Sequence, residues 1–355
     1  MSTSGAALTP LVRLVLALPI VVGAVSPLHA QHSRVVNGRV VVQRAGDAVP
    51  LAGSLVTLHR VGSDTAGAID SVKSDAKGRY TFSYRPFGAE RAVYFAAVMF
   101  GGIAYFTPPL GNESTSGEQA EITVFDTAST GIDIAVRGRH LAISSPSTTG
   151  NRAVVDVFEL GNDSMRTLVQ GRESNGQARA TWRMPLPEGA LNAAVMRDAG
   201  DIAAAAVTVT NGEAVVFAPF APGMKQLALR YEIPAAHDSL TIPLLETTGV
   251  LEVLLEESDA RASGGGLADK GPVTVDGRSL HRFLAQDVAS SAVITVGLPR
   301  ARASSGNRAW MLAGLGALIA AGLAVFLLRR TPGFGAQGPK AESRMNAETD
   351  ADKRG

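Results

Sequence analysis

Short runs of alternating apolar and polar residues make up most of the chain from Arg34 to about residue 300, and clusters of Gly, Pro, Asp and Asn separate them. In one run, Tyr80, Phe82 and Tyr84 alternate with polar residues. Because successive side chains of a strand point to opposite faces, this run predicts a strand with one face in a core and one face in water. The whole pattern predicts an all-β body of tandem β-sandwich domains.

The second part of this body, residues 131–300, continues in the same style without a recognisable motif. Residues 227–233 alternate strictly, and residues 251–255 are apolar at nearly every position, which suits a strand buried on both faces. A Pro-rich break lies at residues 219–223. We therefore expect either one large sandwich or two smaller ones divided near residue 218.

An apolar segment near the N-terminus runs from Leu14 to Val25, directly after Arg13, and contains twelve uncharged residues. As a helix it would cover about 18 Å, which is too short for a hydrocarbon core of about 30 Å. This segment predicts a secretory signal peptide over residues 1–30, with cleavage after Ala30. The alternative is an uncleaved signal anchor.

A second apolar segment spans residues 309–328 and contains no charged residue. Twenty helical residues cover about 30 Å, so we expect one C-terminal transmembrane helix in contact with membrane lipid. A linker at 301–308 precedes it, and a disordered cytoplasmic tail at 329–355 follows it. With the signal peptide, this predicts a single-pass protein of the cytoplasmic membrane whose body lies on the exported side, periplasmic or extracellular. The alternative is a buried helix of a soluble protein.

Small residues recur within this second segment. Gly316, Ala320 and Ala324 follow one another at a spacing of four residues and would share one ridge of a helix. Such ridges let two membrane helices approach closely, so the ridge is a candidate for helix association. The simpler explanation is that Ala and Gly are abundant throughout the chain.

Three motifs in residues 34–127 occur in a fixed order: V-x-G-x-V, P-L-x-G-x-x-V-x-L and D-A-x-G-x-Y-x-F. Their turn and core positions are Gly38, Pro50, Gly53, Asp75, Gly78, Tyr80 and Phe82. This order and spacing resembles the carboxypeptidase regulatory-like family. The resemblance implies a seven-stranded, transthyretin-like (prealbumin-like) β-sandwich. It also implies an accessory or spacer module that contributes no catalytic residues.

Composition excludes several classes of protein. The chain has 33 Lys and Arg against 32 Asp and Glu, so the formal net charge of +1 gives no electrostatic case for binding nucleic acid. The absence of Cys excludes disulfides, zinc fingers, iron–sulfur ligation and thiol catalysis. Abundant Ala, Gly and Arg with few Lys suggests a bacterial source.

The sequence contains none of the common catalytic motifs. The chain has no nucleophile elbow, zinc-binding H-E-x-x-H, EF-hand loop or dinucleotide fingerprint. A zinc carboxypeptidase needs a carboxylate three residues after a ligating His, and His59, His140, His237 and His281 all lack one. We therefore expect no catalytic residue, no metal and no cofactor.

The leading hypothesis is a non-enzymatic, membrane-anchored exported protein that serves as an interaction or scaffold component of the cell envelope and binds an envelope protein. One alternative is a cell-wall glycan-binding module in which Tyr94, Tyr105 or Trp182 stacks on sugar rings. A second alternative is a membrane-tethered hydrolase with an unrecognised site in residues 131–300.

Overall fold

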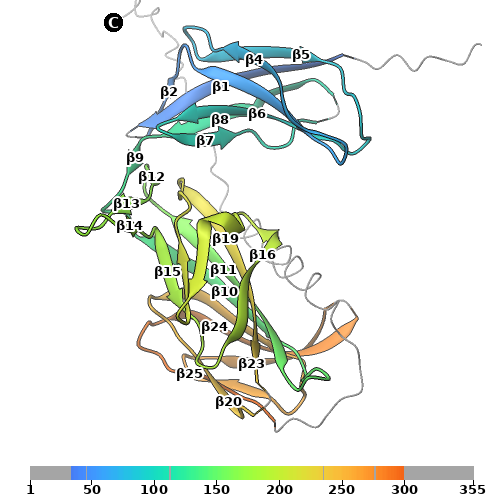
Figure 1. The fold of residues 1–355 in the computed structure, drawn as a ribbon, viewed down its shortest axis with the longest axis vertical. Coiled ribbons are helices and arrows are strands. Elements are labelled where there is room, and N and C mark those ends of the chain that lie inside the picture. Colours follow the sequence, from blue (N-terminus) through green and yellow to red (C-terminus); the bar gives the residue numbers. More distant parts are fainter. Residues whose placement is uncertain (1–32, 45, 112, 235, 276, 300–355) are drawn as a thin grey trace, which may run out of the picture.

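A computed structural model of the protein describes residues 33–299 except residues 45, 112, 235 and 276 (Figure 1). The described residues form β-strands and one short 3-10 helix at Ala204–Ala206, so the prediction of an all-β body is confirmed. None of the helices in the described part is long and apolar enough to cross a membrane. The predicted signal peptide, linker, transmembrane helix with its small-residue ridge, and tail all lie outside the described residues.

The first domain consists of two packed sheets. One sheet contains β1 (Arg34–Arg44), β2 (Asp47–Pro50), β5 (Arg79–Tyr84) and β8 (Thr115–Phe125). The other has the order β4 (Ala66–Lys73), β3 (Leu55–Val61), β6 (Val93–Phe100) and β7 (Ile103–Phe106). Strand β1 is antiparallel to β2 and β5 but parallel to β8. A single hydrophobic core lies between the two sheets.

The predicted turn between β4 and β5 is held by side-chain and backbone geometry. The Asp75 carboxylate accepts hydrogen bonds from the backbone N–H groups of Lys77 and Arg79, each at 2.8 Å. Gly78 has a φ of +73°, which favours glycine. These hydrogen bonds, with the one from the Arg79 side chain, hold the pKa of Asp75 below its usual value. The turn therefore sets the start of β5.

The remaining motif positions build the core next to this turn. A Cβ on Gly38 would overlap the Ala120 carbonyl and the Tyr80 ring, so β1 approaches β8 closely only because residue 38 is glycine. Tyr80 and Phe82 point into the core, and the Tyr80 hydroxyl donates to the Ala120 carbonyl at 2.7 Å. Pro50 ends β2, and Gly53 lies in the turn before β3.

The second domain is built on one sheet of seven strands, which follow one another across the sheet in a fixed order. They are β16 (Leu191–Gly200), β19 (Gly223–Ile233), β11 (Arg152–Asn162), β10 (Ile134–Ile143), β21 (Thr248–Leu255), β24 (Arg278–Val288) and β23 (Ala268–Val275). Strands from before and after residue 218 pair within this sheet and share one hydrophobic core. Residues on both sides of position 218 therefore belong to one domain, and not to two sandwiches divided near residue 218.

Two three-stranded sheets complete this core. The first contains β15 (Trp182–Pro185), β18 (Glu213–Val216) and β17 (Val207–Thr210). The second contains β20 (Ser239–Ile242), β25 (Ile294–Gly297) and β22 (Arg261–Ser263). Their buried residues belong to the same hydrophobic cluster as the inner face of the large sheet. A further two-stranded ribbon pairs β13 (Gly171–Arg172) with β14 (Ala178–Arg179).

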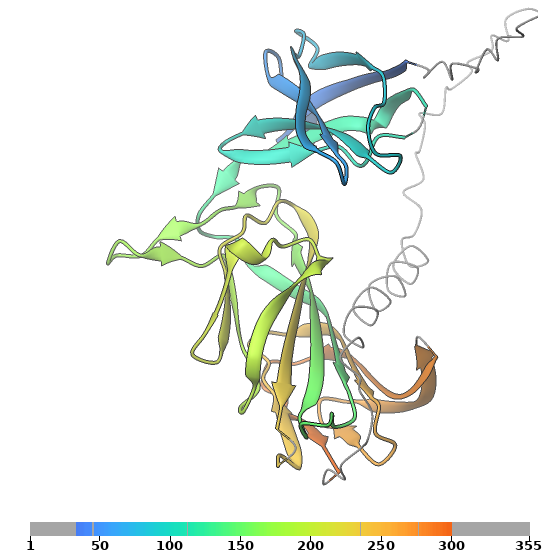
Figure 2. The same cartoon turned by 45° about the vertical axis from the view of Figure 1, so that its right-hand side comes forward.

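The domains are joined by short paired segments (Figure 2). Strand β9 (Thr127–Ala128), directly after the first domain, pairs in parallel with β12 (Thr167–Leu168) of the second. The hydroxyls of Tyr105 on β7 and Thr167 on β12 lie 2.7 Å apart, and both residues are buried. Because a buried hydroxyl pair is lost when the segments separate, this junction favours one arrangement of the two domains.

A buried ion pair lies in the core of the second domain. The Arg139 guanidinium donates two hydrogen bonds to Asp156, at 2.7 and 3.0 Å, and both side chains are fully buried. The Tyr231 hydroxyl donates to the same carboxylate at 3.2 Å, and the Arg139 guanidinium lies over the Phe158 ring at 4.7 Å. Burial raises the pKa of Tyr231 well above its usual value, and the Asp156 charge raises it further.

Replacing Asp156 by Asn should destabilise the second domain by about 3–5 kcal/mol, because it leaves the Arg139 charge buried without its counter-ion. Urea unfolding of the full chain, followed by circular dichroism, measures this loss. The matched control is Asp163→Asn, which breaks the exposed pair with Arg137 and should cost far less. Equal losses for both variants would contradict the expectation.

Candidate functional site

The outward side of β3, β6 and β7 carries a largely apolar surface, which we call the apolar face, and β4 borders it with Ser71 and Lys73. Val56, Leu58, Tyr94, Ala96 and Val98 point into the core, so the residues between them point outward. The apolar face consists of ten outward residues of β3, β6 and β7: Leu55, Thr57, His59, Val61, Val93, Phe95, Ala97, Met99, Ala104 and Phe106.

Several large side chains of the apolar face are exposed to water. Met99 is 64% exposed, and Phe106 and Leu55 are each 56% exposed. Val61 and Val93 are also exposed. None of the ten residues is Asp, Glu, Lys or Arg. Scattered exposed apolar residues are ordinary, but a contiguous uncharged group of them on one sheet is typical of an interaction surface.

An aromatic cluster occupies the centre of the apolar face. The rings of His59 and Phe95 lie nearly parallel, with centroids 5.2 Å apart. The Phe106 ring meets Phe95 edge-on at a centroid distance of 5.6 Å. These contacts hold the exposed rings in place before any partner binds, which lowers the entropy cost of binding.

Large and small side chains alternate across neighbouring strands of the apolar face, so its surface is uneven. Phe106, Ala97 and Thr57 lie side by side on β7, β6 and β3. Ala97 is only 8% exposed, so it forms a low floor beside the protruding Phe106 ring. The Thr57 hydroxyl lies 3.1 Å from the Ser71 hydroxyl on β4. The surface therefore has a protrusion, a floor and a small polar border in one row.

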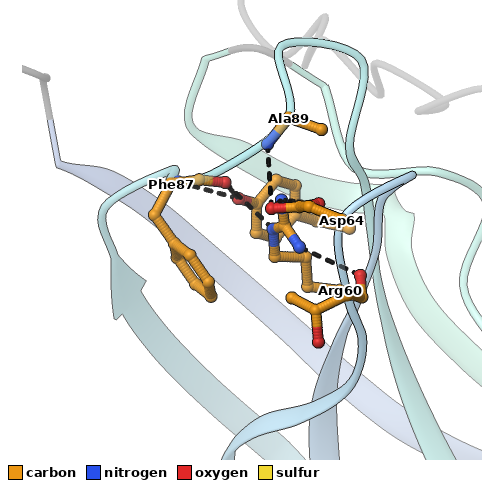
Figure 3. Close-up of polar contacts among 6 residues, drawn as sticks. Arg60, Asp64, Phe87 and Ala89 are labelled. Carbon is orange, nitrogen blue, oxygen red and sulfur yellow. Dashed lines mark hydrogen bonds and ion pairs between the residues drawn. The ribbon is translucent and has the colours of Figure 1, made fainter.

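Arg60 holds the loops at one end of this sheet (Figure 3). Its guanidinium donates to both oxygens of Asp64, at 2.8 and 3.0 Å, and to the carbonyls of Phe87 and Thr65, each at 3.0 Å. The Ala89 N–H donates to the Asp64 carboxylate at 3.2 Å. The hydrogen bond from Arg60 holds the pKa of Asp64 below its usual value. The Arg60 side chain is fully buried, so its role is to position the loops next to the apolar face.

The aromatic residues singled out from the sequence do not form a sugar-stacking platform. Tyr94 is 2% exposed, and Tyr105 and Trp182 are each 7% exposed. The Tyr94 hydroxyl contacts Phe87, that of Tyr105 contacts Thr167, and the Trp182 indole donates to Glu246. Buried rings cannot stack on a sugar, so the prediction for these three residues is corrected.

The neighbours of two of these residues lie on the apolar face instead. Phe95 follows Tyr94 and Phe106 follows Tyr105, and the alternation of a strand turns each neighbour outward. For Tyr94 and Tyr105, the outward aromatic residue is therefore the next one along the strand. Pairing of 93–100 with 103–106 as a hairpin around Gly101 and Gly102 was the available signal, because it puts Phe95 and Phe106 on one face.

A polar row crosses the seven-stranded sheet. His140 Nδ1 lies 2.8 Å from a Glu252 oxygen, and Arg282 donates to the other Glu252 oxygen at 2.5 Å. Burial alone would raise the pKa of Glu252, but His140 and Arg282 outweigh it and hold that pKa below its usual value. Burial raises the pKa of Glu159, which lies in the same row. His140 and Arg282 satisfy the Glu252 carboxylate, whereas the buried His140 Nε2 has no hydrogen-bond partner among the described residues.

Two arrangements common in catalytic sites are absent from the described residues. No hydroxyl in the described part of the chain is hydrogen-bonded to a histidine ring, as a Ser–His nucleophile would require. Across residues 33–299, with the gaps given above, no three His, Asp or Glu side chains are grouped so as to hold a metal ion. A groove of about 750 Å³ lies over β1 and β5. Within it, Arg39 pairs with Glu121 and Arg79 pairs with Asp75, so the charges balance within each pair.

Comparisons with known proteins add no family. No family model matches the chain, and no curated protein matches it. Among solved structures, an M1 zinc metallopeptidase from Deinococcus radiodurans is 13% identical, with a TM-score of 0.29. A two-domain M1 zinc metallopeptidase variant bound to L-tryptophan is 12% identical, also with a TM-score of 0.29. In both cases the match covers 46% of this chain and 42% of the peptidase chain. Similarity this weak supports no conclusion about function.

Replacing Met99 by Lys should change the free energy of unfolding by no more than about 0.5 kcal/mol, because the side chain already lies in water. The matched control is Val98→Lys, one residue away but in the core, which should prevent stable folding of the first domain because it buries a charge. Chemical unfolding of the two full-length variants measures the contrast. A severe loss of stability for Met99→Lys would show that this position is not on an exposed face.

Proposed function

We propose that this protein is a non-enzymatic interaction component of the cell envelope that binds a partner protein through the apolar face of its first domain. The observation that carries the proposal is the exposed, uncharged apolar surface of β3, β6 and β7. The cores of protein interfaces are depleted of charged residues and enriched in aromatic residues and Met. The apolar face has this composition.

The mode of binding follows from the backbone. Strand β3 is paired with β4 and β6, and β6 is paired with β3 and β7, so their N–H and C=O groups are engaged within the sheet. A partner that packs on β3 and β6 therefore meets side chains, whereas β7 is the edge strand of this sheet. The interface is a layer of packed side chains, like the contact between two sheets or between a sheet and a helix.

Membrane anchoring is part of the same proposal. After removal of residues 1–30, the segment 309–328 holds the protein in the cytoplasmic membrane as a single-pass anchor. The two domains then lie on the exported side, and residues 329–355 lie in the cytoplasm. The two-sheet architecture of residues 34–125 supports the assignment of the first domain to the carboxypeptidase regulatory-like type, which would make it an accessory module.

Glycan binding is the second candidate function. The exposed Phe106 ring and the half-buried Phe95 ring, with the Thr57 and Ser71 hydroxyls on the same face, combine a stacking surface with hydrogen-bonding groups. The exposed aliphatic side chains around them, such as Leu55 and Met99, favour a protein partner, because a sugar offers no apolar surface large enough to cover them.

The proposal is tested with a photo-crosslinking amino acid, p-benzoylphenylalanine, placed at position 106 of the full chain in its native membranes. We expect defined protein adducts from position 106. The matched control places the same group at Thr81, which is exposed on the other sheet and should give none of these adducts. Identical adducts from both positions, or none from 106, would contradict protein binding by the apolar face. Adducts with wall fragments alone would favour glycan binding.

Topology gives an independent prediction. In cells whose outer layers have been removed, added protease should digest the two domains and leave an epitope on residues 329–355 intact. The physical reason is that the membrane, which the predicted helix crosses, separates the two compartments. An epitope at the same place becomes accessible only after detergent lysis, which is the control. Release of the whole body by alkaline carbonate would argue against an integral anchor.

A further inference from the structure

We propose that the partner of the apolar face is a second copy of this chain, so that two first domains pack sheet against sheet. This inference rests on the proposed function, since it names the occupant of the same surface. Packing of like faces is the commonest way in which soluble proteins form dimers.

Charge is the first argument. In a two-fold contact the same surface patch meets itself, so any net charge on the patch would face its own copy and repel it. A contact with a different protein has no such requirement, because the partner can carry the opposite charge. The ten residues of the apolar face include no Asp, Glu, Lys or Arg, and the charged Lys73 on β4 lies at the border of this face, opposite Leu55.

Shape is the second argument. Phe106 protrudes next to the low floor at Ala97 in a single cross-strand row, and Met99 protrudes two residues further along β6. When two copies face each other, the protruding side chains of each copy can sit over the Ala97 floor of the other. A surface that carries both a protrusion and a matching floor is self-complementary, and side chains of the two sheets interdigitate.

Size determines where this contact forms. Specific interfaces use about 20–30 residues on each side, and the apolar face has only ten. A dimer of this size should be weak between free molecules. Anchoring two chains in one membrane raises their effective concentration, so a small contact suffices there. The predicted small-residue ridge at Gly316, Ala320 and Ala324, outside the described residues, would act in the same direction.

The absence of native Cys makes the test direct. A single Thr57→Cys substitution places a thiol within the apolar face of the full chain in its native membranes. A short bismaleimide should then join two copies into a species of twice the mass. The matched control is Thr81→Cys, on the exposed side of the other sheet, which should give little of this species.

A second substitution tests whether the apolar face itself makes the contact. Adding Met99→Lys to the Thr57→Cys chain should lower the yield of the doubled species by about tenfold or more, because each copy then buries a charge against its partner. Circular dichroism checks that this double variant is folded. Yields unchanged by Met99→Lys, or equal to those of Thr81→Cys, would show that proximity alone causes the crosslink and would overturn the proposal.

The remaining outcomes separate this inference from the function on which it rests. If Thr57→Cys gives no doubled species while position 106 still forms adducts with another protein, the second copy is ruled out and the interaction function stands. If neither reagent gives an adduct, both proposals fail. If position 106 labels the chain itself, with the doubled species lost on Met99→Lys, both are supported.

Discussion

The structure of the first domain depends on one constraint: each sheet of a sandwich can turn only one face to the core. Tyr94, Tyr105, Val56 and Leu58 fill the inner face of the second sheet, and the strand period then places their neighbours outside. On a sheet with one face in water these outer positions are usually polar. Here they include Phe, Met, Leu and Val, so that the domain closes one core and leaves a second, largely apolar surface uncovered.

An apolar face binds a partner at a lower entropy cost where the sheet that carries it is already ordered. The buried Arg60, with its hydrogen bonds to Asp64, Phe87 and Thr65, fixes the loops at one end of the apolar face. The Tyr94 hydroxyl adds a contact to the Phe87 backbone. Burial of the apolar face is worth about 25 cal/mol for each Å² removed from water, so a partner gains this free energy without first ordering the surface.

The second domain gives the first a fixed base. Its seven-stranded sheet draws strands from the whole of residues 134–288, and the Arg139 and Asp156 pair with Tyr231 ties the central strands through one buried network. The junction at Tyr105 and Thr167 connects this base to β7, which itself carries part of the apolar face. A change in the relative position of the domains would therefore displace β7, which lies at the edge of the apolar face.

Much of the architecture was accessible from the sequence, because it depends on local periodicity and turn chemistry. The alternation at 79–84, the Asp75 to Gly78 turn and the all-β class follow from short-range rules. The absence of Cys likewise excluded disulfides without a structure. The sequence did not show which of Tyr94 and Phe95 points into the core. Both residues are aromatic, so hydropathy alone does not tell which face of the strand is buried. The joining of strands across residue 218 depended on contacts far apart in the chain. Only the tertiary structure decides such features, since the core selects one face of each strand and pairs strands regardless of their distance in sequence.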